Sequence, residues 1–183
     1  QVGLGLLELH AATGELEWLE SARDLAERLV ERFHVDGEGF YDGEPGHLPA
    51  RARDVFDGAA PSASAAACEL LARLAGVYDR GDWADIVQRS IERQAALLEA
   101  APAAVPTMLL VHLISEHGAD LLLPGGDHPL SIVRSDFAPL VTFLSAPPTT
   151  TRVAIRVEYS AGTSTCALAE ELAVDVWTEE RAP

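Results

Sequence analysis

The feature that most constrains the fold of this chain is a repeat of two helical pairs at an offset of 65 residues. Apolar, tryptophan and charged positions of the first pair recur in the second. The residues in register are Leu6/Leu71, Leu9/Leu74, Trp18/Trp83, Glu27/Glu92 and Arg28/Arg93. Such self-similarity is the signature of a repeated helical-hairpin architecture, in which each hairpin buries an apolar face against its neighbour.

Helical periodicity covers residues 3–12 and 16–33, and Thr13-Gly14 breaks the two helices apart. In the second helix one apolar stripe recurs at three- and four-residue steps. Its members are Leu16, Leu19, Ala22, Ala26, Leu29, Val30 and Phe33. The glycine-flanked segment 35–43 then predicts a tight turn or a short β-excursion, and residues 44–53 are expected to be extended.

The second pair is predicted from Pro61 to Gly76 and from Trp83 to Ala100, with a fifth helix from Pro106 to Gly118. After Gly118 the pattern changes: residues 121–126 predict a short buried strand that ends in a turn, and a short helix is expected at 128–137. The β-branched runs 140–144 and 151–159 predict two more strands. We therefore expect a mainly α chain, with helical hairpins over 1–118 and a small α/β appendix over 119–183.

Charge and composition exclude several classes of partner. Thirteen basic residues, all Arg, stand against 29 carboxylates, and the resulting formal charge of −16 disfavours nucleic acid and anionic lipid. The apolar runs are far shorter than the roughly 20 residues that span a bilayer. The chain begins with Gln1 and contains a single Met, so we interpret it as a fragment, with the cytoplasm as the default location because no signal sequence is seen.

Three segments carry a family resemblance. They are Gly5-Leu-Leu-Glu-Leu-His-Ala-Ala-Thr-Gly-Glu-Leu-Glu-Trp-Leu19, Gly37-Glu-Gly-Phe-Tyr-Asp42 and Asp54-Val-Phe-Asp-Gly-Ala-Ala-Pro-Ser62. Their order and spacing resemble the C-terminal part of the thioredoxin-domain-containing YyaL/spermatogenesis-associated protein 20 family, over about residues 3–118. The resemblance implies an arc of a six-hairpin α/α toroid, similar to the N-acylglucosamine 2-epimerase and six-hairpin glycosidase folds. It also implies a thioredoxin-like domain that is absent from this chain.

In such toroids the loops between hairpins rim a central cavity, which makes Asp57 the candidate general acid or base and Asp54 its partner. Arg53 would separate the pKa values of the two carboxyl groups. Tyr41 and Phe56 would stack on a sugar ring, and Ser62 completes the candidate substrate-binding residues. The alternative is purely structural: Asp57-Gly58 forms a turn and Ser62 caps a helix.

Other titratable residues give weaker signals. His112 and His117 are five residues apart and no HExxH motif occurs, so we expect no metal and no cofactor. His10 and His34 are read either as cavity residues or as capping and surface residues. Cys68 and Cys166 show no CxxC spacing, and Cys68, within an alanine run, is expected to be a small buried apolar residue. Gly125-Gly-Asp-His-Pro129 is read as a plain strand-to-helix turn, with anion binding as the alternative.

Two functions follow from this reading. The first is carbohydrate binding or epimerase- or hydrolase-like chemistry at Asp57. The second is a non-catalytic helical scaffold that docks a thioredoxin domain or another protein. The family's Asn and Ser after the Pro-Ser pair are replaced here by Ser64 and Ala65, and this loss of polar groups favours the scaffold.

Overall fold

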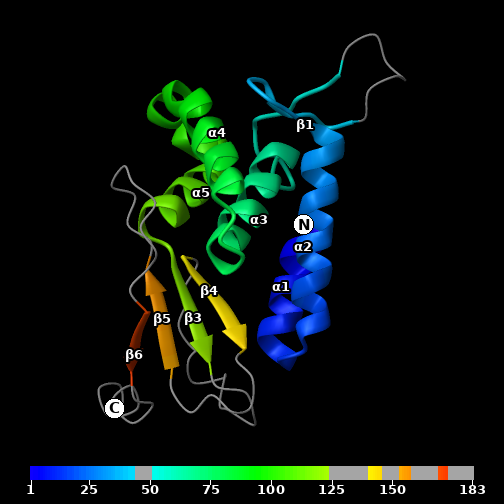
Figure 1. The fold of residues 1–183 in the computed structure, drawn as a ribbon. Coiled ribbons are helices and arrows are strands. Elements are labelled where there is room, and N and C mark those ends of the chain that lie inside the picture. The colour runs from blue at the N-terminus through cyan, green and yellow to red at the C-terminus, as the bar shows by residue number, and fades with distance from the viewer. Residues whose placement is uncertain (44–50, 124–139, 146–152, 158–168, 173–183) are drawn as a thin grey trace.

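The computed structural model describes residues 1–43, 51–123, 140–145, 153–157 and 169–172. Helices dominate the described part, and a small sheet lies at one end of them (Figure 1). The prediction of a mainly α fold with a small strand-containing appendix is thereby confirmed. The toroid itself, the division at residue 118 and the short helix at 128–137 stay predictions, and the last of these falls outside the described residues.

The first hairpin consists of α1 (Val2–Thr13) and α2 (Leu16–Phe33). Gly14 ends α1 in the left-handed conformation, at φ 75°, and its N–H bonds to the carbonyl of His10 at 2.8 Å. The α2 stripe packs inward through Leu19, Ala22 and Ala26. Leu16 was wrongly included in that stripe: it is 56% exposed, because it is the first residue of the helix and lies beyond its packed face.

A two-stranded hairpin follows α2, as the segment 35–43 predicts. Strand β1 (His34–Val35) pairs antiparallel with β2 (Gly39–Phe40). The turn needs glycine because Gly37 and Gly39 have φ values of 73° and 92°.

Helix α4 (Gly81–Ala100) holds this small hairpin through two arginines. Arg89 forms a 3.1 Å ion pair with Asp36, and Nη2 of Arg93 donates to the carbonyl of Gly37 at 2.7 Å.

The second hairpin, α3 (Ala63–Val77) and α4 (Gly81–Ala100), provides the centre of the core. Leu71, Leu74 and Trp83 are fully buried there. Their counterparts at the 65-residue offset are not: Trp18 is half-buried and Leu9 is 44% exposed. Of the two tryptophans in register, Trp83 is therefore fully buried and Trp18 only partly, because the second hairpin is covered by more neighbours than the first.

A short 3-10 helix, η1 (Pro102–Ala104), leads into α5 (Pro106–His117), whose Met108, Val111 and Ile114 are buried. Strands β3 (Ala119–Leu123), β4 (Val141–Ser145), β5 (Val153–Val157) and β6 (Ala169–Leu172) form a sheet in the order β4-β3-β5-β6. Among these described strands, β3 pairs parallel with β4, whereas β5 pairs antiparallel with both β3 and β6. Strand β6 was not expected from the sequence.

The sheet packs against the helices through β4. Arg73 on α3 donates through Nη1 to the carbonyl of Val141 at 3.3 Å, and Leu144 packs on the helical core. The other side of the same guanidinium forms a 2.9 Å ion pair with Glu69 one turn earlier. Among the described helices, none is long and apolar enough to cross a membrane.

Candidate functional site

The loop before α3 is tied to two helix starts by the carboxylate of Asp57. One oxygen accepts the N–H of Ser62 at 2.8 Å, and the other accepts the N–H of Thr107 at 2.7 Å. The backbone N–H of Asp57 itself donates to the carbonyl of Ala104 at 3.0 Å. These three bonds join the loop that precedes α3 to the start of that helix, to η1 and to the first turn of α5.

These bonds lower the pKa of Asp57. Partial burial by itself raises that pKa, because it disfavours the charged form, but the backbone N–H groups of Ser62 and Thr107 stabilise the carboxylate. The hydroxyl groups of the same two residues lower the pKa further. Thr107 lies in the first turn of α5, where the helix dipole also favours a negative charge. Asp57 is therefore ionised at neutral pH with both oxygens engaged.

Asp54 and Arg53 make separate contacts. Asp54 is exposed, and its carboxylate accepts the nearby N–H of Phe56 at 3.1 Å, while its own N–H donates to Asp42 at 2.8 Å. Arg53 donates through Nη1 to the backbone carbonyl of Glu38. The loop thus places Asp54 and Asp57 in different hydrogen-bonding surroundings, each with its own partners.

The two aromatic candidates differ in how much of their rings is free. The Tyr41 hydroxyl donates to a carboxylate oxygen of Glu38, and this bond raises the tyrosine pKa. The guanidinium of Arg51 lies 4.3 Å from the centre of the Tyr41 ring, and that of Arg53 lies 5.7 Å from it. Phe56, by contrast, is 52% exposed. Phe56 is therefore the more open of the two rings.

Ser62 is the N-cap of α3. Its side-chain oxygen accepts the N–H of Ala65 at 3.2 Å, and the residue is buried. The structural alternative predicted for Ser62 is therefore realised.

His10, His34 and Cys68 each have a local structural explanation. His10 is buried, with Nδ1 at 3.0 Å from the carbonyl of Glu15. The ring of His34 packs on Phe40, with 5.1 Å between ring centres, and partial burial lowers the pKa of this histidine. Cys68 is buried as expected, and burial raises the pKa of its thiol to about 11. Cys166 and the turn at residues 125–129 lie outside the described residues.

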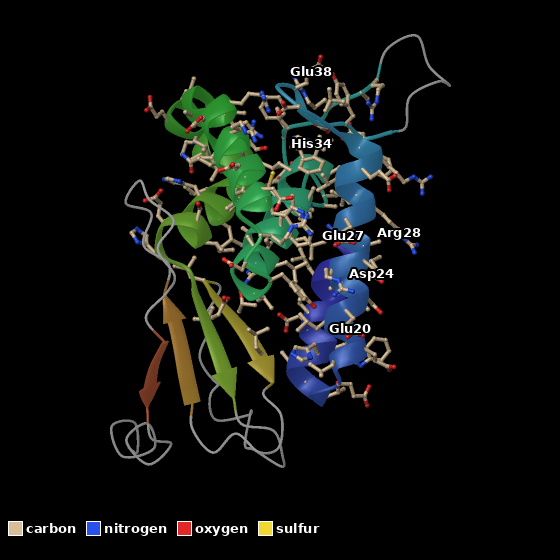
Figure 2. The ribbon with its side chains drawn as sticks, in the orientation of Figure 1. Glu20, Asp24, Glu27, Arg28, His34 and Glu38 are labelled. Carbon is tan, nitrogen blue, oxygen red and sulfur yellow. The ribbon has the colours of Figure 1, made fainter. Side chains whose placement is uncertain are left out.

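Figure 2 labels His34 and Glu38 near the small hairpin, and Glu20, Asp24, Glu27 and Arg28 along α2. Two of these α2 carboxylates form ion pairs: Asp24 with Arg23 at 2.9 Å, and Glu27 with Arg80 at 3.2 Å. Within the described part of the chain, no group of three or more His, Cys, Asp and Glu side chains is placed to hold a metal ion.

Sequence reasoning missed Thr107, the second partner of the Asp57 carboxylate. The available signal was Pro106, which marks the start of a helix whose first N–H groups have no partner within the helix. A carboxylate from elsewhere in the fold can accept these N–H groups at the helix start. Nothing in the local sequence pattern identifies which carboxylate does so.

No protein-family model matches the chain. Over 109 residues it is 34% identical to spermatogenesis-associated protein 20 of Rattus norvegicus and 33% identical to the protein of that name of Homo sapiens. Each match covers 57% of this chain but only 14% of the relative's length. The chain is therefore related to the YyaL/spermatogenesis-associated protein 20 family, as its sequence motifs predict.

Proposed function

We propose that the helical part of this chain is a non-catalytic scaffold, and that Asp57 is a structural element of it. The observation that carries the proposal is the engagement of both Asp57 oxygens by backbone N–H groups of Ser62 and Thr107. General acids and bases work best with a pKa near the working pH. The lowered pKa of Asp57 leaves it without a proton to donate at neutral pH and makes it a weak base.

Asp54 does not form a catalytic pair of carboxylates with Asp57. Two-carboxylate sugar chemistry uses a pair that faces one substrate, with environments that push the two pKa values apart. Here Asp54 is exposed and bonded to the backbone of Phe56, two residues away. The pair therefore supports a folded loop more directly than it supports acid–base catalysis.

The scaffold has an implied partner. The family resemblance suggests a thioredoxin-like domain, or another protein, docked on the helical hairpins. A cytoplasmic location remains part of the proposal.

A second candidate, carbohydrate binding, is favoured by one observation: the half-exposed ring of Phe56 beside the exposed carboxylate of Asp54. Aromatic rings that face solvent next to a hydrogen-bonding acceptor are suited to stacking on a sugar. In this version Phe56 and Asp54 bind the ligand, Arg53 and Tyr41 contribute to the same loop surface, and Asp57 holds the loop.

Thermal unfolding of the 183-residue chain with millimolar mono- and disaccharides separates these functions. For the scaffold we expect no sugar to raise the melting temperature, and we expect Asp57→Asn to lower it with or without sugar. For a carbohydrate site, a sugar raises the wild-type melting temperature and Phe56→Ala abolishes the shift. A sugar shift that Asp57→Asn removes without changing the melting temperature of the free protein would overturn the structural role of Asp57.

A further inference from the structure

We draw no further inference here: the strongest candidate, the buried side chain of Gln94 on α4, whose Oε1 accepts no hydrogen bond within the described part of the chain, carries nothing because no second feature among the described residues shows what ligand would bind there.

Discussion

Replacing Asp57 by Ala should destabilise the chain by about 2–3 kcal/mol. Two backbone N–H groups, those of Ser62 and Thr107, lose a charged acceptor at once. A hydrogen bond to a charged group contributes about 1.5–3 kcal/mol, and we use the lower end because the carboxylate is only partly buried. For a chain of this size the melting temperature should fall by roughly 4–12 °C.

Urea unfolding of the wild type, Asp57→Ala and Asp57→Asn at several pH values measures the loss of stability and shows whether it comes from the charge of Asp57. A carboxyl group whose pKa is lowered by folding contributes stability above its unfolded pKa of about 3.9 and loses it as the pH falls through the folded pKa. The free-energy difference between wild type and Asp57→Asn should therefore be constant from about pH 5 to 8 and should shrink below about pH 4.

Asp54→Ala is the control, because its carboxylate is exposed and holds only a nearby N–H; the change should stay within about 0.5 kcal/mol. The reasoning is refuted if Asp57→Ala is as mild as Asp54→Ala. It is also refuted if the difference between wild type and Asp57→Asn changes between pH 6 and 8, which would indicate a raised pKa.

Three further outcomes are expected. Ser62→Ala removes the cap of α3 and should cost about 1 kcal/mol in urea unfolding, whereas the exposed neighbour Ala63→Ser should cost less than half of that. Gly39→Ala places a Cβ on a residue with a φ of 92°, and that Cβ would lie 2.7 Å from Nη1 of Arg93. The substitution should lower the melting temperature and speed amide exchange in the small hairpin. An unchanged melting temperature would contradict the hairpin geometry. Cys68 should not react with a thiol reagent at pH 8 in the folded chain, because it is buried and its pKa is about 11; rapid labelling of Cys68, located by peptide mapping, would show that α3 opens.

The sequence predicts the helices well because their signals are local. Thr13-Gly14, Pro61 and Pro106 mark the ends of helices within one or two residues, and periodicity identifies the buried side of α2. How deeply a residue is buried, by contrast, depends on elements that are distant in the sequence. Leu9 and Leu74 occupy equivalent positions of the repeat, yet only Leu74 has a neighbour on every side.

The sheet was harder to predict for the same reason. Strand β6 (Ala169–Leu172) contains two adjacent glutamates and lacks an alternating pattern, so its assignment depends on pairing with β5. Strand β4 contacts the helices in part through Arg73, which lies 68 residues before the carbonyl that it contacts. Neither partner is visible in a local window.

The Asp57 loop shows most clearly what sequence can and cannot decide. An Asp-Gly turn followed by Pro-Ser predicts a loop and a helix cap, and both are present. The same sequence is equally compatible with a carboxylate that lines a cavity. The deciding contact is with Thr107, 50 residues further along the chain. That N–H and the N–H of Ser62 stabilise the charged carboxylate and lower its pKa. Removing the carboxylate should therefore weaken the starts of α3 and α5, and this makes the stability of those two helix starts the property to measure first.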